Sequence, residues 1–404
     1  MKQQNKDTNN NFLLIGIDGG ATKVSGWQIH VNEKDESFLL GQNNAERVYN
    51  NIPGFVADFK PIELAKQLAE KEMAQINPTD DEQQQAAVYV EACAQVIEEL
   101  IEKCNNNRVL IGIGMPGLKT GDKRGIAMIA NGPRMIRFSD QLERRLQIRE
   151  IDFVQHIHKL GSDADYCGIG ENYSEDGLLR DVKNGYYLGG GTGAADAMKL
   201  NSQLVPFDDA KEWIAKSWEM KNADGLSMEQ FASSGGIQNM YAKISRIDRI
   251  ELNAKQIYPP QIAEMAKDSD NNAIKTFNLI AENLAILLYE RITTIFAGWQ
   301  EMLTFINPNK PELIKDHPFR NHVFDRIIIG QRLGELFASD TGYSILKQPV
   351  LDKLDQFIQQ SNSLDDNAKK HYKKLNAIIQ VSKLRAAPAL GAGINAYLNW
   401  KKQG

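Results

Sequence analysis

The first part of the chain alternates short apolar runs with polar turns. Phe12–Ile17 is an apolar run that ends at Asp18-Gly19-Gly20, which is typical of a buried strand entering a tight turn. Val24–Val31 and Ser37–Leu40 are predicted as the second and third strands, joined by the polar turn Asn32–Asp35. We therefore predict an antiparallel meander of three strands before the first long helix.

A helical period then replaces the strand pattern. Between Ala86 and Cys104 apolar side chains recur every three to four residues and glutamates occupy the other positions, which predicts an amphipathic helix. Arg108–Ile113 returns to the pattern of a buried strand, and that strand breaks at Met115-Pro116-Gly117. The start of the chain thus predicts one βββαβ unit.

The second half repeats this order of elements without a clean repeat of residues. Gly185–Leu188, Ala197–Leu200 and Gln203–Val205 are predicted strands, Asn272–Phe296 is a long helix, and Asp325–Ile329 is a strand before Gly330. We predict an α/β protein of the two-domain actin/hexokinase-like (ribonuclease H-like) class, with duplicated βββαβα units around a cleft.

The length of 404 residues exceeds what one hydrophobic core usually organises, so two domains are expected. Residues 1–11 are rich in Gln, Asn and Lys and are predicted as a disordered tail. Residues 12–160 are predicted as the N-terminal domain and 161–404 as the C-terminal domain. The last helix is expected either to stay with the second domain or to pack back on the first.

The composition of the chain argues against several classes of protein. The net charge is −5 with acidic and basic residues interleaved, which argues against a nucleic-acid surface. No apolar run approaches the ~20 residues that span a bilayer, and the start of the chain does not resemble a signal peptide. Cys93, Cys104 and Cys167 form no Cys-x-x-Cys pair, so a structural zinc site is not expected. Three scattered thiols favour a reducing cytoplasm, and we expect a cytoplasmic protein with no membrane partner.

The first glycine turn has the residue types of a phosphate loop. Gly19 and Gly20 let the backbone approach a phosphate and present bare N–H groups, Thr22 adds a hydroxyl and Lys23 a cation. Asp18 would lie near a bound Mg²⁺, in direct contact or through its water shell. The alternative is a plain hairpin, since Asp-Gly and Gly-Gly are common hairpin turns.

The second glycine turn is harder to explain by turn chemistry alone. It consists of Gly189, Gly190, Gly191, Thr192 and Gly193 after a predicted strand. Each glycine in an ordered element costs about 0.5–1 kcal/mol relative to Ala, so four together indicate a backbone that lies close to a ligand such as phosphate. The segment is not the Walker pattern, because no Gly-Lys-Ser/Thr follows, and a Rossmann turn is poorly supported, because strands rather than a helix follow the glycines.

Two further stretches of small residues could admit a flat nucleobase. Ile327–Gly330 is the first, and Pro388–Gly393 is the second. The competing interpretation is a strand end and a small-residue packing face on a helix.

Asp163 is the candidate catalytic carboxylate. Phosphoryl transfer to a hydroxyl needs a carboxylate within hydrogen-bond reach of the attacking oxygen, and Asp163 lies in Gly161-Ser162-Asp163-Ala164-Asp165. The competing interpretation is a helix cap, in which Ser162 and Asp165 open a helix over Ala164–Glu171. Both are compatible, because a capped helix start can also present an acid.

In this order the motifs resemble the ROK (repressor, open reading frame, kinase) family of sugar kinases, within the actin/hexokinase-like superfamily. The likeness extends from Phe12 to Trp400. The segments that carry it are Asp18–Lys23, Ile111–Gly117, Asn131-Gly132-Pro133, Ser162–Asp165, Leu188–Gly193, Met228–Gly235, Ile327–Gly330 and Pro388–Gly393.

The resemblance implies an activity and a set of roles. It implies ATP- and Mg²⁺-dependent in-line phosphorylation of a hydroxyl on a hexose or N-acetylhexosamine, with Asp163 as general base. The two glycine turns and Gly330 would bind ATP. Asn131, Ser162, Asp163 and Glu229 would contact the sugar. A homodimer is the assembly that the family's habit suggests.

The chain also departs from the family pattern. Val205–Asp209 stands where the family has Glu-x-Gly-His, the zinc-binding cysteines are absent, and Ser162 replaces an Asn. Gln331-Arg332 replaces glycines and is expected to crowd the adenine pocket. The alternative function is therefore a catalytically degenerate sugar- or nucleotide-binding regulatory protein on the same fold.

Two other functions of related proteins find little support in the sequence. The repressors of the family carry a helix-turn-helix before the first strand, and the first predicted strand here starts at Phe12. An ATPase activator of the BadF type would need cysteines placed to hold an iron–sulfur cluster, and Cys93, Cys104 and Cys167 lack that pairing.

Overall fold

The computed structural model describes residues 11–403, and nearly all of the predicted tail over residues 1–11 lies outside this range. The chain divides into two compact units. Unit 1 comprises the chain up to Asp176 together with residues from Ala386 onward, and unit 2 comprises Gly177–Arg385. The helix that begins at Asp163, which the sequence was expected to place in the second domain, and the last helix therefore both belong to unit 1.

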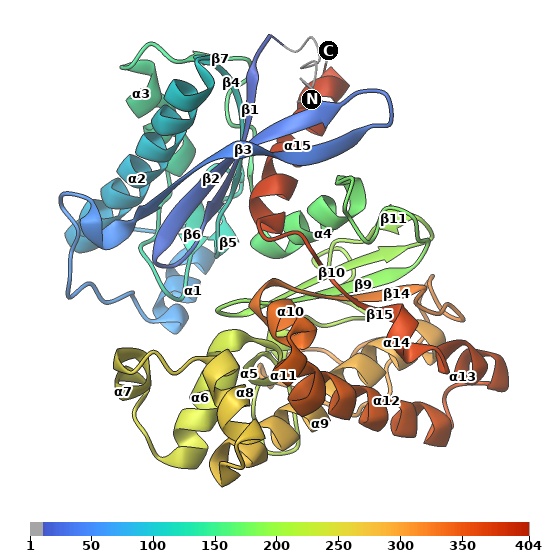
Figure 1. Ribbon diagram of the computed structural model, residues 1–404. Coiled ribbons are helices and arrows are strands. Elements are labelled where there is room, and N and C mark those ends of the chain that lie inside the picture. Colours follow the sequence, from blue (N-terminus) through green and yellow to red (C-terminus); the bar gives the residue numbers. More distant parts are fainter. Residues whose placement is uncertain (1–10, 404) are drawn as a thin grey trace, which may run out of the picture. The chain divides into compact units, whose positions relative to one another are not determined.

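Unit 1 is built on one mixed sheet with helices on both faces (Figure 1). Its elements are β1 (Leu13–Gly19), β2 (Lys23–Asn32), β3 (Ser37–Val48), the 3₁₀ turn η1 (Tyr49–Asn51), α1 (Leu64–Glu72), α2 (Asp80–Cys104), β4 (Arg108–Gly114), β5 (Leu118–Lys119), β6 (Ile126–Met128), α3 (Phe138–Gln147), β7 (Asp152–Phe153), β8 (Leu160–Gly161), α4 (Asp163–Tyr173) and α15 (Ala387–Gln403).

The sheet of unit 1 has the strand order β3-β2-β1-β4-β7, with β8 also paired to β4. β1, β2 and β3 are antiparallel neighbours, so the predicted meander is confirmed. β4 runs parallel to β1 after the long helix α2. This order of elements confirms the βββαβ unit predicted from the hydrophobic pattern.

Alternating residues of β1 face different helices, as the period of a strand requires. Ile15 and Ile17 belong to the apolar core that α2 completes. Gly16, between them, faces α15 so closely that an added Cβ would lie 1.9 Å from the Ala389 carbonyl oxygen. Gly112 of β4, directly opposite Gly16, meets α15 in the same way. The sheet therefore holds α15 in place through positions that lack side chains.

Unit 2 repeats the strand order of unit 1 and adds a larger set of helices. Its elements are β9 (Gly185–Gly190), β10 (Ala194–Leu200), β11 (Gln203–Leu204), η2 (Ser217–Glu219), β12 (Met220–Lys221), α5 (Glu229–Ala232), α6 (Ser234–Ser245), α7 (Arg249–Ala254), α8 (Pro259–Lys267), α9 (Asn271–Ala297), β13 (Thr304–Phe305), β14 (Arg326–Gly330), α10 (Gln331–Ala338), α11 (Asp340–Gly342), the π-helical turn η3 (Tyr343–Lys347), α12 (Gln348–Gln360), α13 (Asp366–Tyr372), α14 (Leu375–Ile378) and β15 (Ile379–Val381).

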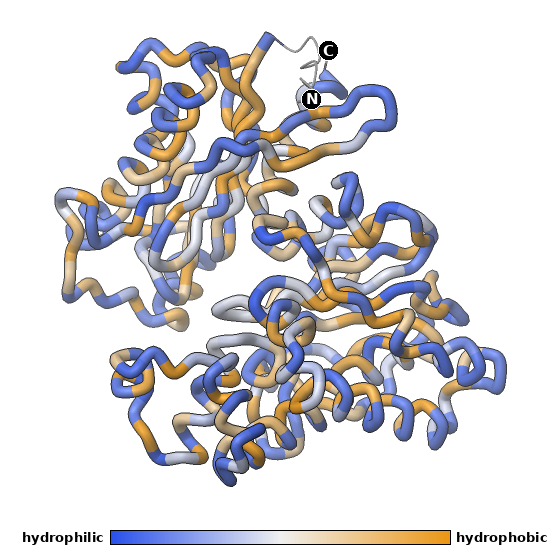
Figure 2. The backbone as a smooth tube through the Cα atoms, viewed as in Figure 1, coloured by the Kyte–Doolittle hydropathy of each residue, from blue (hydrophilic) through white to orange (hydrophobic). Residues whose placement is uncertain are grey.

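The sheet of unit 2 has the order β11-β10-β9-β14-β15. β9 is antiparallel to β10 and parallel to β14, which matches the relation of β1 to β2 and β4. The predicted duplication of the unit is confirmed at the level of topology. In the tube view, hydrophobic colour follows the inner strands, and hydrophilic colour gathers in the loops (Figure 2).

A buried ionic network ties β10 to α9 inside unit 2. Asp196 accepts hydrogen bonds from the Tyr186 hydroxyl at 2.5 Å and from the backbone N–H and the hydroxyl of Ser217. Arg291 lies 3.1 Å from the Asp196 carboxylate and 2.8 Å from that of Glu290. All three charged side chains are almost completely buried. The network therefore joins the central strands to the longest helix of the unit.

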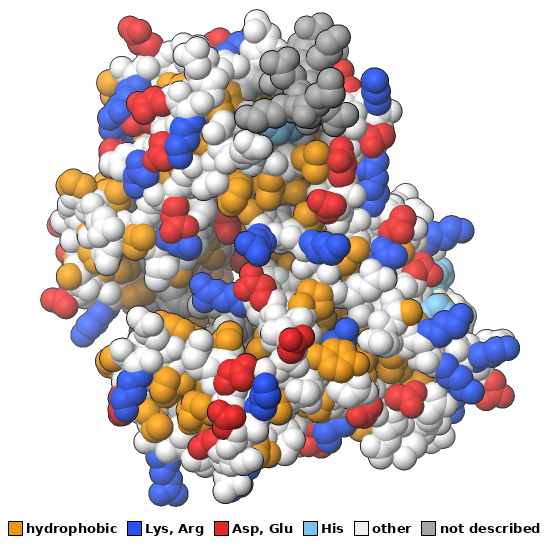
Figure 3. Space-filling view, viewed as in Figure 1, with side chains coloured by type: hydrophobic (Ala, Val, Ile, Leu, Met, Phe, Trp, Pro, Cys, Tyr) orange, Lys and Arg blue, Asp and Glu red, His pale blue; other side chains and the backbone are white. Residues whose placement is uncertain are grey.

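The surface carries both signs of charge. On the face shown in Figure 3, Lys and Arg side chains are interspersed with Asp and Glu. Among residues 11–403, no helix combines the length and the apolar character that crossing a membrane requires.

Candidate active site

Asp18 and Asp163 meet at one edge of the unit 1 sheet. Asp18, the second-last residue of β1, lies opposite Gly114 of β4, and Gly114 is in turn opposite Gly161 of β8. The three strands are parallel, so their carboxyl ends share one edge of the sheet, where α/β proteins place their ligands. Asp163 begins α4 directly after this edge. The sheet thus brings together two carboxylates that are far apart in sequence.

The start of α4 satisfies both interpretations of the Gly161–Asp165 segment. The Ser162 hydroxyl accepts a hydrogen bond of 3.1 Å from the Asp165 backbone N–H, so Ser162 is the N-cap residue. Asp163 is the first residue of the helix, its side chain is exposed, and one oxygen accepts from the Ala164 N–H at 3.0 Å. The helix is capped and still presents an acid to solvent.

The environment of Asp18 destabilises the charged form of its carboxyl group. Burial near the end of β1 and, to a smaller extent, the neighbouring charge of Asp163 raise its pKa to about 7, although Lys23 partly opposes both effects. A carboxylate with this environment is stabilised by a cation that is shared with its acidic neighbour.

The pair has the chemistry of a magnesium site that is completed by a ligand. Mg²⁺ is usually held by one or two protein carboxylates together with substrate phosphates and water. Within residues 11–403, no group of three or more His, Cys, Asp or Glu side chains is placed to hold a metal ion. Asp18 with Asp163 therefore fits a cation that arrives with a phosphate ligand, and does not form a complete cage.

Asp18→Asn is expected to stabilise the protein without divalent cations, and the gain should depend on pH. The carboxyl pKa is raised in the folded state, so ionisation of Asp18 destabilises the folded wild type. This destabilisation is absent below the unfolded pKa of 3.8, grows as the pH rises to about 7, and is constant above that. Because Asp18 is partly exposed, we expect a gain on the order of 2 kcal/mol at pH 8.

Thermal unfolding of the two proteins between pH 4 and pH 9, in the presence of a chelator, measures this difference. The Asn variant of Asp58 provides the control, because Asp58 is an exposed carboxylate of the same unit. An Asp18→Asn protein that is less stable than wild type at pH 8 would contradict the account of Asp18.

Two tyrosines hold the first glycine turn. The Tyr49 hydroxyl donates to the Gly20 carbonyl at 3.2 Å, the Tyr89 hydroxyl donates to the Ala21 carbonyl at 3.0 Å, and the Tyr49 N–H donates to the Thr22 carbonyl. Their rings stack with centroids 3.8 Å apart. The backbone of this turn is therefore fixed from one side by residues that sequence analysis did not identify.

The turn is also a hairpin between β1 and β2, as the alternative interpretation states. The Gly20 N–H donates to the Lys23 carbonyl at 2.8 Å, so this amide is already engaged. The Lys23 ammonium lies 2.6 Å from the Glu46 carboxylate on β3. Both Lys23 and Glu46 are nearly half exposed, so this ion pair is weak and can be exchanged for a phosphate.

The second glycine turn joins β9 to β10 and rests on the start of α6. The turn is closed by a hydrogen bond from the Gly191 N–H to the Gly193 carbonyl at 2.9 Å. The Gly191 carbonyl accepts from the N–H groups of Ser234 and Gly235. Thr192 is exposed at the tip. The turn is thus a rigid, glycine-lined surface.

Glu229 lies directly on this second turn. Its carboxylate accepts from the Ala194 N–H at 3.0 Å, and a Cβ added to Gly193 would meet the same carboxylate at 2.8 Å. The Met228–Gly235 segment and the glycine turn, which the sequence predicted as separate motifs, are therefore adjacent within unit 2. The absence of a side chain at Gly193 makes this close approach feasible.

Gly330 and Gln331 complete the group in unit 2. Gly330 ends β14 directly opposite Gly189 of β9. Gln331 follows with a φ of 57°, in the left-handed region that favours glycine. A Cβ added to Gly191 would lie 2.5 Å from the Gln331 side-chain oxygen. Gln331 therefore covers part of the second glycine turn.

Pro388–Gly393 forms a small-residue packing face on a helix, which is one of the two interpretations of this stretch. This stretch forms the first turns of α15 and is buried throughout. Gly391 is so close to α4 that an added Cβ would lie 1.9 Å from the Tyr166 carbonyl oxygen. Its small residues let α15 pack on α4 and the unit 1 sheet, as the packing interpretation predicts.

Asn131 lies in unit 1, on the loop that follows β6. Its side chain is exposed, whereas Gly132, Pro133 and Arg134 after it are buried. The Tyr89 hydroxyl lies 3.3 Å from the position that a Cβ on Gly132 would take. Tyr89 therefore contacts both the first glycine turn and the loop of Asn131.

No protein-family model matches the sequence, and no curated protein matches it. The fold, in contrast, has many relatives among solved structures. It is similar to a ROK family glucokinase from Streptomyces griseus in complex with glucose and AMPPNP, with a TM-score of 0.56, 14% identity, and coverage of 95% of this chain and 98% of that chain. It is equally similar to a putative sugar kinase from Cytophaga hutchinsonii, with a TM-score of 0.55, 15% identity, and coverage of 96% and 99%.

A regulator shares the same fold. A ROK family transcriptional regulator, described as a homologue of the E. coli MLC protein, matches with a TM-score of 0.53 and 14% identity over 97% of this chain and 79% of that chain. The comparisons thus show the two-domain α/β fold of ROK kinases over nearly the full length, at low identity. These similarities do not distinguish an enzyme from a regulator, so the argument for either function rests on the geometry of the site.

Proposed function

We propose that this protein is a sugar kinase that transfers the γ-phosphate of ATP to a hydroxyl of a hexose or N-acetylhexosamine. The observation that carries the proposal is the placement of Asp163, which is exposed at the start of α4 beside the partly buried carboxylate of Asp18. A regulator that only binds a sugar needs neither an acid with a solvent-accessible oxygen nor a second acid that favours a cation.

Asp163 acts as the general base. As the sugar oxygen forms its bond to the γ-phosphorus, the bond from that phosphorus to the oxygen shared with the β-phosphate breaks, and the hydroxyl proton passes to the Asp163 carboxylate. Within unit 1, Asn131 and Ser162 contact the sugar. Mg²⁺ held at Asp18 would supply positive charge to the phosphates of the donor.

The glycine turns bind the phosphates, because the absence of side chains lets a phosphate approach their backbones. In unit 1, Gly19, Gly20, Thr22 and Lys23 form one phosphate-binding turn, with Lys23 leaving Glu46 to pair with phosphate. In unit 2, the turn from Gly189 to Gly193 forms the other, and Gly330 borders it.

The second candidate function is a sugar- or nucleotide-binding regulator without catalysis. Gln331 favours it, because its side chain covers Gly191 from a backbone conformation that would suit glycine. The fold is also that of a transcriptional regulator. In this function the second glycine turn would no longer admit ATP.

An ATP-consumption assay with a panel of hexoses, N-acetylhexosamines and polyols distinguishes the two functions. We expect ADP release, with Mg²⁺ present, that depends on one class of sugar and yields a sugar phosphate in equal amount. Thermal unfolding with the same ligands provides the second measurement, since a ligand that binds the folded state raises the melting temperature. Stabilisation by a sugar without any ADP release would favour the regulator and contradict the kinase.

A further inference from the structure

Helix α1 is attached to unit 1 by polar side chains rather than by its leucines. Leu64 and Leu68 are 49% and 45% exposed, whereas Gln67, between them, is fully buried. An amphipathic helix normally buries its apolar face, because burial of a leucine contributes about 1.5–3 kcal/mol. The reversed orientation indicates that the contacts of Gln67 determine how this helix is placed.

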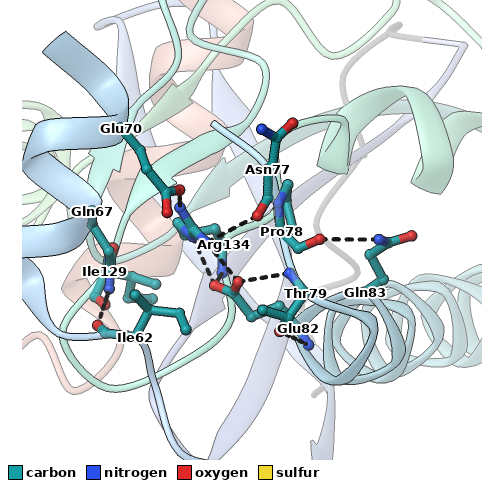
Figure 4. Close-up of polar contacts among 10 residues, drawn as sticks. All are labelled: Ile62, Gln67, Glu70, Asn77, Pro78, Thr79, Glu82, Gln83, Ile129 and Arg134. Atoms are coloured by element: carbon teal, nitrogen blue, oxygen red, sulfur yellow. Dashed lines mark hydrogen bonds and ion pairs between the residues drawn. The ribbon is translucent and has the colours of Figure 1, made fainter. Parts of the chain in front are cut away.

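Gln67 binds the backbone of Ile129 as a neighbouring strand would (Figure 4). Its side-chain oxygen accepts from the Ile129 N–H at 2.9 Å, and its side-chain nitrogen donates to the Ile129 carbonyl at 3.0 Å. The same nitrogen donates to the Ile62 carbonyl at 2.6 Å. The start of the loop from 129 to 134 is thereby fixed to α1.

Arg134 fixes the other end of that loop (Figure 4). Its guanidinium binds the Glu82 carboxylate in a two-pronged contact, with both distances 2.7 Å, and also pairs with Glu70 of α1. Glu82 caps α2 at the same time, because it accepts from the Thr79 N–H at 3.0 Å. Arg134 and Glu82 are each only 1% exposed, so this end of the loop is held by a buried ion pair.

Two neighbouring residues between the anchors are exposed to solvent. Ile129 and the run from Gly132 to Met135 are buried, while Ala130 and Asn131 are exposed. A short segment that is fixed at both ends has little freedom, so the Asn131 amide is presented in one place. Such preorganisation lowers the entropy cost of binding a ligand.

We infer that Gln67 and Arg134 are positioning residues that set the affinity for the acceptor sugar by fixing the loop of Asn131. This inference rests on the proposed function, in which Asn131 contacts the sugar. It assigns α1 and the start of α2 to the acceptor side of the site, as a clamp made of Gln67, Glu70, Glu82 and Arg134.

Gln67→Leu tests the clamp, with Gln85→Leu as the matched control. Gln85 is buried on α2, and its side-chain oxygen accepts from the N–H of Val56, a residue outside the loop, at 2.9 Å. We expect Gln67→Leu to raise the KM for the sugar at least about tenfold, while kcat and the KM for ATP stay within about twofold, because positioning of the acceptor is lost. Gln85→Leu should change none of these constants, even if both variants lose similar stability.

A double-mutant cycle with Asn131→Ala shows whether Gln67 acts through the loop. In the Asn131→Ala background, Gln67→Leu should raise the sugar KM by less than about twofold, because the contact that it positions is already absent. An effect of the same size in both backgrounds would overturn the inference.

Hydrogen exchange of the Ile129 amide provides a measurement that needs no substrate. Gln67→Leu should accelerate this exchange about tenfold or more, and Gln85→Leu should not. Unchanged exchange, or faster exchange with an unchanged sugar KM, would overturn the inference while the kinase proposal stands. A wild-type protein that phosphorylates no sugar would instead overturn the kinase proposal, and the inference with it.

Discussion

Asp163→Asn is expected to lower the rate of sugar phosphorylation by at least about 100-fold, since a positioned general base contributes about 10²–10⁴ to the rate. The Asn side chain has nearly the same shape, and its oxygen can still accept from the Ala164 N–H, as one Asp163 oxygen does now. The start of α4 should therefore keep its structure. Only the ability to take up the hydroxyl proton is removed. Steady-state measurement of kcat with saturating ATP and sugar gives the result.

The control for this variant is Asp165→Asn, two residues further into the same helix. The Asp165 N–H, which the substitution leaves in place, donates to the Ser162 cap. The proposed transfer gives the Asp165 side chain no role, so this variant should keep kcat within a few-fold. If Asp163→Asn kept wild-type activity, the assignment of the general base would be wrong.

A second measurement on Asp163→Asn is independent of activity. The charge of Asp163 is one of the two causes that raise the Asp18 pKa, after burial. Removing that charge should lower the Asp18 pKa and raise the melting temperature above pH 7 when no divalent cation is present. Together, lost activity and gained stability would distinguish a removed base from a damaged helix.

Much of the fold follows from local sequence patterns. The run Phe12–Ile17 and the run Asp325–Ile329 predicted the central strands β1 and β14, because a buried strand is apolar on both faces. The amphipathic period predicted α2 and the apolar stripe predicted α9, each to within six residues at every end. The Ser162 cap was also legible, since a serine before a helix has a local chemical purpose.

Other elements were missed because their residues carry no local signal. The prediction ended the third strand at Leu40, whereas β3 continues to Val48 through a polar stretch. Those polar residues are extended because they pair with β2, and the pairing is a tertiary contact that propensity cannot reveal. Similarly, the Thr79–Glu82 capping box could have located the start of α2 six residues earlier than the apolar pattern did.

The candidate site likewise contains residues that the sequence indicates and residues that it does not. Asp18, Asp163 and the glycine turns were recognisable from their residue types and order. Tyr49 and Tyr89 were not, because their hydroxyls reach the first turn only after η1 and α2 have packed. Likewise, the pairing of Arg134 with Glu82 spans 52 positions of sequence, and nothing near either residue indicates the partner.

Arg291→Met is expected to be among the most destabilising single changes in unit 2. Asp196 and Glu290 would both remain buried without their cation, and removal of one partner from a buried ion pair costs about 3–5 kcal/mol. For a unit of this size the melting temperature should fall by roughly 6–20 °C. The control is Lys255→Met, which removes a pair with Glu251 in which both side chains are more than half exposed and should cost less than about 1 kcal/mol.

The Glu290→Gln variant distinguishes the cost of unpaired buried charges from the cost of the packing that Arg291→Met removes. Burial raises the pKa of Glu290, which means that its negative charge destabilises the folded state above the ordinary carboxyl pKa. The Gln side chain can still accept from the Thr294 hydroxyl, as Glu290 does at 2.6 Å, and carries no charge. We therefore expect Glu290→Gln to recover part of the loss when it is combined with Arg291→Met, which also removes the donor that Glu290 Oε2 accepts from. If the double variant were as unstable as Arg291→Met alone, the cost would come from the lost guanidinium packing against Tyr186 and Phe207 rather than from the unpaired charges.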